Sequence, residues 1–308
     1  MQNIYESVSA NKRKSVFVTF FFFVFAALSV YFIVAALNYW YGYDAGGLGI
    51  FGIAMIISGI TTFIGYYFSD KIVLSISSAK PADKNTDRLF YSVTENLVIG
   101  SGLPMPKLYV IEDGAPNAFA TGRNPENAVV CVTTGLLEKL DRTELEGVIA
   151  HELSHIKNYD IRLMSIVAVL VGSIALLADI FLRVRFTGGR RDNDSGSIGV
   201  ILFVVGILFA ILSPIIANLI KLAISRRREF LADAGSVAIT RQPQGLINAL
   251  MKISQDPEPL EAANKATAHL YIENPFKNKI ADNRSKFSKL FNTHPPLEER
   301  LIALKSMQ

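Results

Sequence analysis

The chain is poor in cysteine and histidine, with one cysteine and four histidines among 308 residues. A single cysteine excludes an intrachain disulfide and favours the reducing, cytoplasmic side of a membrane. Cys131 lies in the run Ala-Val-Val-Cys-Val, so we expect an inert, buried strand residue and not a nucleophile. Because histidines are so few, two of them at a metal-ligand spacing are an informative signal.

Charged residues are also scarce, at 19% of the chain, whereas 50% is hydrophobic and the mean hydropathy is +0.32. This balance is too apolar for an ordinary soluble protein and indicates segments that span a membrane. The net charge is +4, and basic residues gather at 12–14, 183–191 and 226–228, next to apolar runs. The sequence has no glycine-rich phosphate loop and no basic motif with interleaved aromatics. We therefore expect the lipid bilayer, and not nucleic acid, as a partner.

The apolar residues form four long runs, at 15–37, 48–68, 164–182 and 198–222. The first two carry no charged residue, and each has the roughly 20 residues that a helix needs to cross a bilayer. The last two are interrupted, by Asp179 and by Pro214 and Asn218. The second pair therefore predicts a spanning hairpin, a partly embedded hairpin or a buried soluble hairpin.

The basic residues around the first hairpin predict its orientation. Lys12, Arg13 and Lys14 precede the first run, the loop at 38–47 has no lysine or arginine, and Lys71 follows the second run. By the positive-inside rule, the N-terminus and the segment after residue 70 face the cytoplasm. We expect a multi-pass protein of the inner or plasma membrane with its chemistry on the cytoplasmic side.

The part between the hairpins has a mixed pattern. Residues 86–99 indicate an amphipathic helix, and 107–111, 117–121 and 128–133 indicate three short strands separated by turns. The organisation that we expect has four segments: a first hairpin at 1–70, a mixed part at 71–163, a second hairpin at 164–222 and a helical part at 223–308.

Residues 151–155 read His-Glu-Leu-Ser-His. On a helix, His151 and His155 lie one turn apart on the same face and can bind a single Zn²⁺, while Glu152 acts as general base toward a metal-bound water. Asp141, with Glu144 three residues later, predicts a capping box where this helix begins. The plain alternative is a pair of solvated helix histidines.

A catalytic zinc takes three protein ligands and keeps one position for water, so a third ligand is needed. A metzincin would have glycine at 158 and a ligand at 161, but Asn158 and Ile161 stand there. Asp160 is a minor candidate, because we expect it at the helix end and turned away from both histidines.

A better candidate lies downstream, where Glu229 and Asp233 are one helical turn apart. Glu229 can complete a two-histidine, one-glutamate site, and Asp233 can accept the free ring N–H of His151 and so fix its tautomer. The alternative is a solvated helix face on which Glu229 pairs with Arg226.

With these residues the chain resembles the HtpX-type membrane zinc metalloproteases, a gluzincin group related to the CAAX prenyl endopeptidases. The matching segments lie, in chain order, at 116–122, 132–137, 151–155, 225–233, 269–275 and 293–300. The resemblance implies an α-helical integral membrane protein with a cytoplasmic α+β, gluzincin-like protease domain. About four transmembrane helices and a small three-stranded sheet are implied with it.

The resemblance also implies roles for single residues. One Zn²⁺ per chain would be bound by the two motif histidines and Glu229, and a peptide substrate would lie extended along the edge strand that contains Asn117. Asn117 and His294 would stabilise the oxyanion, although Asn117 can also be a turn residue and His294 a helix cap. Arg300 is expected to make a structural salt bridge near the site. His269 is expected to be structural.

The function implied is a zinc metalloendopeptidase that cuts misfolded or damaged membrane proteins in a stress-linked quality-control role. Unfolded proteins are then its expected partners. Two alternatives stay open: a CAAX prenyl endopeptidase-like processing protease, and a catalytically silent zinc-binding membrane chaperone.

Overall fold

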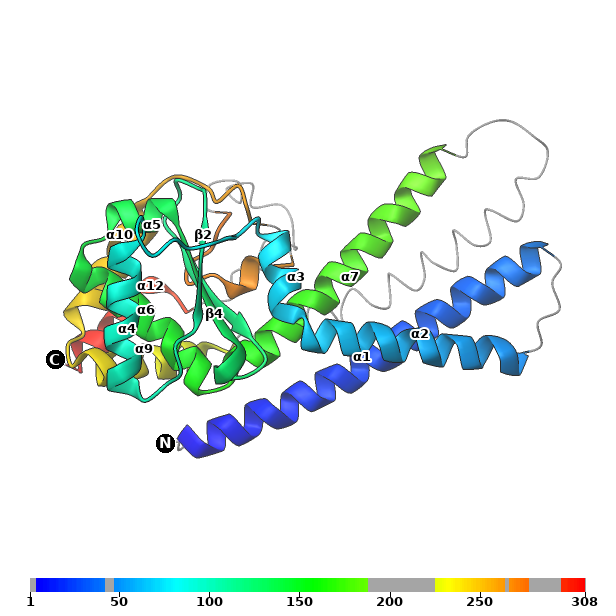
Figure 1. Ribbon diagram of the computed structural model, residues 1–308, viewed down its shortest axis with the longest axis horizontal. Coiled ribbons are helices and arrows are strands. Elements are labelled where there is room, and N and C mark those ends of the chain that lie inside the picture. Colours follow the sequence, from blue (N-terminus) through cyan, green and yellow to red (C-terminus); the bar gives the residue numbers. More distant parts are fainter. Residues whose placement is uncertain (1–3, 42–46, 188–224, 264–265, 277–294, 308) are drawn as a thin grey trace.

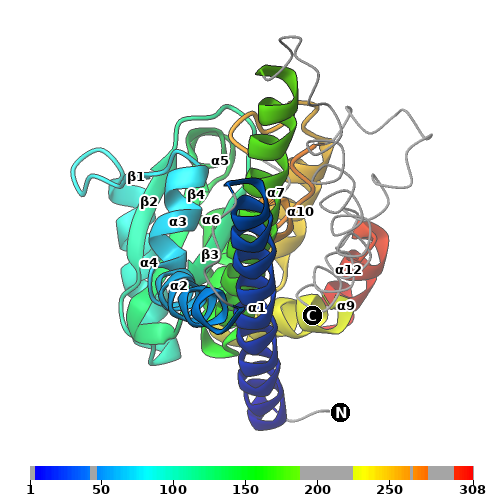
Figure 2. The same ribbon diagram turned by 90° about the vertical axis from the view of Figure 1, so that its right-hand side faces the viewer.

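The structure is a computed structural model that describes residues 4–41, 47–187, 225–263, 266–276 and 295–307. It has a globular part built around a small sheet, from which three long helices extend (Figures 1 and 2). These helices are α1 (Ile4–Tyr41), α2 (Gly47–Tyr67) and α7 (Asp160–Thr187). The helices of the globular part are α3 (Ser69–Ile76), α4 (Arg88–Ser101), α5 (Thr134–Lys139), α6 (Arg142–Lys157), α9 (Arg226–Thr240), α10 (Gln244–Gln255) and α12 (Leu297–Lys305), with short 3-10 turns at Pro125–Asn127 and Ala268–Leu270.

The sheet is mixed and has the strand order β1-β2-β4-β3. Its strands are β1 (Lys80–Pro81), β2 (Lys107–Ile111), β3 (Ala118–Gly122) and β4 (Ala128–Thr133). β2 and β4 are parallel, whereas the other two pairs are antiparallel. Two strands have their expected bounds and β3 is shifted by one residue, but the expectation of three strands is wrong. The added strand β1 is two residues long and contains proline, so it has no alternating pattern to detect.

Cys131 lies in the central strand β4, where its backbone pairs with Tyr109 of β2 and Phe119 of β3. Its side chain is fully buried, and burial raises the pKa of the thiol above its usual value. The environment fits the expected inert strand residue, because the thiolate that would react is disfavoured there.

Helix α6 forms the centre of the globular core and packs against α4, α9, α10 and the sheet. The expected capping box is present at its start: the backbone N–H of Glu144 donates to Asp141 and the backbone N–H of Asp141 donates to Glu144, both at 2.9 Å. Its apolar residues are fully buried in the core, namely Leu145, Val148, Ile149, Leu153 and Ile156. A helix that is capped and buried along its length is a rigid support for the side chains that it carries.

The long helices present apolar surface to their surroundings. Val16, Phe20 and Ile56 are each more than 60% exposed. Among the described residues, the segment Val8–Tyr31 of α1 is long and apolar enough to cross a membrane. The bent pair α2–α3, with 74° between its halves, adds a second such segment if it counts as one span. These surfaces fit a hydrocarbon environment better than water.

The second hydrophobic pair is only partly described. The run at 164–182 lies in α7, and the first turns of this helix are buried against α1 and the globular part through residues such as Val167 and Leu170. The run at 198–222 lies outside the described residues. The expectation of four transmembrane helices therefore stays a prediction.

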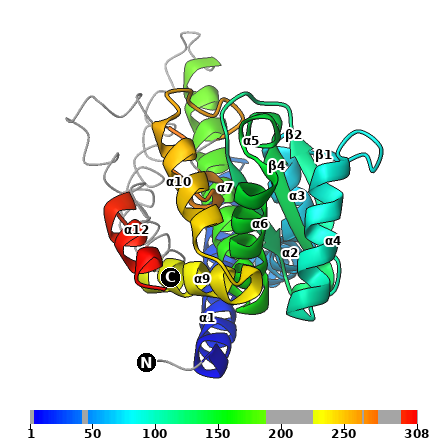
Figure 3. The same ribbon diagram turned by 90° about the vertical axis from the view of Figure 1, so that its left-hand side faces the viewer.

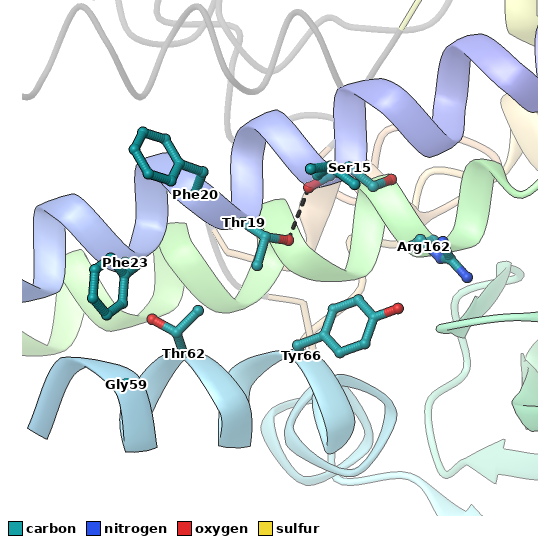
Figure 4. A pocket seen from close by; sticks show the side chains of 9 residues that line it. Ser15, Thr19, Phe20, Phe23, Gly59, Thr62, Tyr66 and Arg162 are labelled. Atoms are coloured by element: carbon teal, nitrogen blue, oxygen red, sulfur yellow. Dashed lines mark hydrogen bonds between the residues drawn. The ribbon is translucent and has the colours of Figure 1, made fainter. Parts of the chain in front are cut away.

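A groove of about 440 Å³ is lined by residues of α1 and α2 (Figure 4). Its walls are mainly apolar, and Arg162 of α7 closes one end. The hydroxyl of Thr19, which faces this groove, donates to the backbone carbonyl of Ser15 at 2.8 Å. None of the His-Glu-Leu-Ser-His residues is among those that line it.

Candidate active site

Three buried side chains converge in the globular part. The Nε2 atoms of His151 and His155 on α6 are 3.2 Å apart. The Glu229 carboxylate on α9 lies 3.8 Å from Nε2 of His151 and 3.5 Å from Nε2 of His155. The two ring nitrogens face one point, and a tetrahedral zinc with Zn–N bonds of about 2.0–2.1 Å would separate them by about 3.3 Å. The nitrogen, nitrogen and oxygen donors therefore fit a single zinc ion.

Close packing of α9 on α6 brings Glu229 to the histidines (Figure 3). Gly235 of α9 faces Ser154 of α6, and a Cβ atom at 235 would overlap the Ser154 hydroxyl. Ser236 of α9 also contacts α6, because its hydroxyl donates to the backbone carbonyl of Gly147 at 2.8 Å. Small residues at this crossing allow the two helices to approach closely.

His151 is supported by a buried carboxylate. Its Nδ1 lies 2.9 Å from Oδ1 of Asp233, the contact that the sequence predicts. Arg300 holds the same carboxylate through two contacts, of 2.9 Å from Nε and 2.6 Å from Nη2. Burial works to raise the pKa of Asp233, but the charge and hydrogen bonds of Arg300 and His151 hold it below its usual value. Burial lowers the pKa of His151 despite Asp233.

His155 has a carboxylate of its own, Asp160, whose Oδ2 lies 3.0 Å from Nδ1 of the ring. The expectation that Asp160 turns away from both histidines is wrong. Helix α6 ends at Lys157, and Tyr159 adopts a left-handed conformation with φ of 59°. This turn breaks the helix, so that α7 begins at Asp160 and returns its side chain toward His155.

The electrostatics of the site favour positive charge. Burial works to lower the pKa of His155, but the hydrogen bond to Asp160 and the charges of Glu229, Asp160 and Glu152 outweigh it and raise the pKa to about 9. Glu152 is 2% exposed and follows His151 directly on α6. The carboxylates that cause this shift also surround the point on which the candidate ligands converge, and a bound cation would compensate their charge.

The structure places the other expected site residues less centrally. Asn117 is buried, and its side-chain amide exchanges hydrogen bonds of 3.1 and 3.4 Å with the backbone of Glu273. His269 is also buried, with Nε2 3.1 Å from the backbone carbonyl of Met164. His294 lies outside the described residues, so its role and that of Asn117 as oxyanion donors stay predictions.

β3 is an edge strand, as the expected substrate-binding mode requires. Its outer edge is already used at one point, because the backbone N–H of Ile272 donates to the carbonyl of Ala118 at 2.9 Å. Arg300 in turn donates to the carbonyl of Ile272 at 3.4 Å. A peptide that pairs with β3 along its full length would therefore have to displace this segment.

Comparison with known sequences decides the family. The profile described as "Peptidase family M48" matches residues 84–308, which include every described residue of the metal-ligand cluster. This chain belongs to peptidase family M48.

Full-length relatives agree with the M48 assignment. A protein named "Protease HtpX homolog" from Dictyoglomus turgidum is 43% identical over 304 residues, which are 98% of this chain and 94% of the relative. Relatives of the same name from Caldanaerobacter subterraneus subsp. tengcongensis and Listeria monocytogenes serotype 4a are each 42% identical and cover 99% of this chain, with 98% and 100% of their own length covered. The expected resemblance to HtpX-type proteases is confirmed, and this M48 member is a membrane metalloprotease.

One solved structure is also similar. The crystal structure of Ste24p from S. mikatae superposes with a TM-score of 0.46 at 17% sequence identity, over 89% of this chain and 62% of that one. This chain thus spans less than two thirds of the length of that protein.

Proposed function

We propose that this M48 protease uses one zinc ion to hydrolyse peptide bonds of misfolded or damaged membrane proteins at the cytoplasmic face of the membrane. The convergence of His151, His155 and Glu229 around one point, with Glu152 beside them, carries this proposal. M48 metalloproteases depend on zinc in general, and the donor set here suits that ion.

The chemistry follows from the position of each group. When bound, zinc lowers the pKa of a coordinated water to about 7 and polarises the carbonyl of the scissile bond. Glu152 accepts a proton from the attacking water and delivers it to the leaving amine nitrogen. Asp233 and Asp160 hold the two imidazoles in the tautomer that presents Nε2 to the metal.

Burial of the site supports an unfolded substrate. His151, Glu152, His155 and Glu229 are each no more than 4% exposed. A folded surface cannot reach groups this deep, so a substrate has to reach them as an extended, unfolded segment. This selection by shape fits a protease that removes proteins which have lost their fold.

Charge distribution supports the cytoplasmic location. Lys12, Arg13 and Lys14 lie on α1 directly before its apolar surface begins, and Lys71 lies on α3 after α2 ends. Basic residues at both ends of a hairpin favour the cytoplasmic side for those ends. The globular part follows α3 in the chain, so it lies on the same side.

The experiment is the substitution Glu152→Gln in the full-length protein in detergent. Loss of the general base should lower cleavage of an unstructured casein by roughly 10²–10⁴-fold, because proton transfer contributes on that order. Bound zinc should stay the same, since the amide removes a base and not a metal ligand. Glu146→Gln is the matched control: it makes the same change on the same helix at a partly exposed ion pair with Arg142.

Retained proteolysis by the Glu152 variant would overturn the mechanism. Absence of casein cleavage by the wild-type protein, together with cleavage of a prenylated peptide, would favour CAAX-type processing. Bound zinc without hydrolysis of either substrate would favour the silent chaperone.

A further inference from the structure

Asn11 is a buried polar residue in an otherwise solvated stretch of α1. Its neighbours Lys12 and Arg13 are exposed, whereas Asn11 is 2% exposed. This end of α1, dark blue in Figures 1 and 2, runs beside the globular part. A buried amide needs hydrogen-bond partners, and those of Asn11 lie next to the metal-ligand cluster.

Both ends of the Asn11 amide are used. Its Nδ2 donates to Oδ1 of Asp160 at 2.6 Å and to the backbone carbonyl of Asn158 at 3.0 Å. Its Oδ1 accepts from Nη1 of Arg228 at 3.2 Å. Asp160, Asn158 and Arg228 are all buried as well. The network therefore excludes water and holds its members in one arrangement.

These partners belong to the two separate halves of the metal site. Asp160 uses its other oxygen, Oδ2, to hold His155, the second histidine of the motif. Arg228 immediately precedes Glu229, the third ligand candidate, on α9. Asn11 thus contacts a neighbour of one ligand and the support of another, and it does so from a third element, α1.

A second contact from α1 reaches the same turn. The ammonium of Lys12 lies 4.2 Å from the ring centroid of Tyr159, the residue in the left-handed conformation between α6 and α7. That conformation is what returns Asp160 to His155. Two adjacent residues of α1 therefore contact the turn that positions a metal ligand.

We propose that Asn11 is a positioning residue of the metal centre, through which the membrane helix α1 orients His155 and Glu229. Asn11 occupies Oδ1 of Asp160, so that Oδ2 is left for His155, and it aligns Arg228 at the start of α9. The metal site then reaches full affinity only when α1 is docked on the globular part. This inference rests on the proposed zinc site.

For this role the side chain at position 11 has to be neutral and able both to donate and to accept a hydrogen bond. A carboxylate at position 11 would place one more negative charge 2.6 Å from Asp160, and alanine would leave the buried Oδ1 of Asp160 without its donor. Either substitution should therefore leave the Asp160 side chain less firmly held, and with it the His155 ring that Asp160 orients.

The experiment measures zinc affinity of full-length Asn11→Ala by competition with a chelator, together with the thermal unfolding of the metal-free protein. Groups that orient a ligand typically contribute 10–100-fold to metal affinity, and we expect about tenfold weaker binding here. The matched control is Ser9→Ala, which changes an exposed side chain on the same helix and should leave affinity unchanged. The cobalt-substituted protein should show an altered visible spectrum for the Asn11 variant alone.

A thermodynamic cycle with Asp160→Asn tests the route of the effect. Since Asn11 acts on His155 through Asp160, the double variant should bind zinc less than threefold more weakly than Asp160→Asn alone. If Asn11→Ala does not fold, Asn11→Asp keeps the size of the side chain and should show the same loss.

The outcomes separate this inference from the proposed function. If the folded Asn11 variants bind zinc as tightly as the wild type does, the inference is overturned and the protease mechanism stays intact. A wild-type protein that does not bind zinc would overturn both. Weaker zinc binding by the Asn11 variants, with the cycle non-additive, supports the positioning role.

Discussion

The two histidines of the proposed metal site are one turn apart on α6, yet the carboxylates that support them differ. Asp233, behind His151, is held by the bidentate guanidinium of Arg300. Asp160, behind His155, receives the neutral amide of Asn11 at 2.6 Å, and Nε of the Arg228 guanidinium lies 3.7 Å from it. The pKa of His151 is lowered, whereas that of His155 is raised to about 9.

The comparison shows that the effect of a carboxylate on the pKa of its histidine depends on which groups compensate the charge of that carboxylate. Arg300 neutralises Asp233, so burial decides the pKa of His151. Asp160 instead receives a neutral donor at 2.6 Å and lies 3.7 Å from Arg228, and its hydrogen bond and charge raise the pKa of His155 together with the charges of Glu229 and Glu152. A histidine ligates a metal only in its neutral form, so binding of a metal at the proposed site would release the proton that the surrounding carboxylates favour on His155.

Arg300→Met is expected to have the largest effect on the difference between the two histidine supports. This change leaves the fully buried Asp233 carboxylate without its cation, and breaking such a pair typically lowers the free energy of unfolding by about 3–5 kcal/mol. Urea unfolding of the metal-free protein measures it. Lys80→Met, which breaks an ion pair with Glu112 whose side chains are 66% and 70% exposed, is the control and should change stability by less than about 0.5 kcal/mol. A loss below about 1 kcal/mol for Arg300→Met would show that Asp233 does not depend on Arg300.

Asp233→Asn and Asp160→Asn compare the two supports directly. Each removes a charge that orients a ligand, so zinc affinity should fall by about 10–100-fold, or about 1.4–2.7 kcal/mol. Asp233→Asn should also destabilise the metal-free protein, because it leaves Arg300 buried without a counter-charge. Chelator competition gives the affinities and urea unfolding the stabilities. If Asp160→Asn binds zinc as tightly as the wild type does, only His151 depends on a supporting carboxylate.

Asp141→Ala is the mildest change, on α6 but outside both supports. Loss of the cap should lower the free energy of unfolding by about 1 kcal/mol. Zinc affinity should stay within about twofold of wild type, because the buried middle of α6 keeps its packing. Thermal unfolding and chelator competition measure the two effects. A large drop in zinc affinity would contradict this expectation. It would show that the packing of α6 as a whole, and not only Asp233 and Asp160, positions the two histidines.

Much of the site was predictable because its signals are short in sequence. The capping box, the apolar stripe and the histidine spacing of α6 each fit within a few turns of one helix, and the spacing of Glu229 and Asp233 is one turn of another. The strands β2 and β4 are mostly apolar runs between turns, and β4 is rich in valine, so their bounds were also predictable. By contrast, the two-residue β1 has no pattern of its own and forms through pairing with β2.

Asp160 shows why the rest was not predictable. A continued helix after His155 would carry it away from the ring, and only the left-handed turn at Tyr159 reverses its direction. Tyrosine rarely adopts that conformation, so the local sequence favours the wrong answer. Packing of α1 and α7 on the globular part holds the turn in place.

The sequence by itself determined the parts of the proposed site: a capped helix with two histidines one turn apart and a glutamate beside them, a distant glutamate–aspartate pair, and apolar runs for a membrane. Only the tertiary structure decided how these parts support one another. Asn11 meets Asp160 across 149 residues and Arg228 across 217, and α9 reaches α6 where glycine allows close approach. Helical periodicity reports on neighbours within a few turns, whereas contacts at such separations arise from the packing of the whole core.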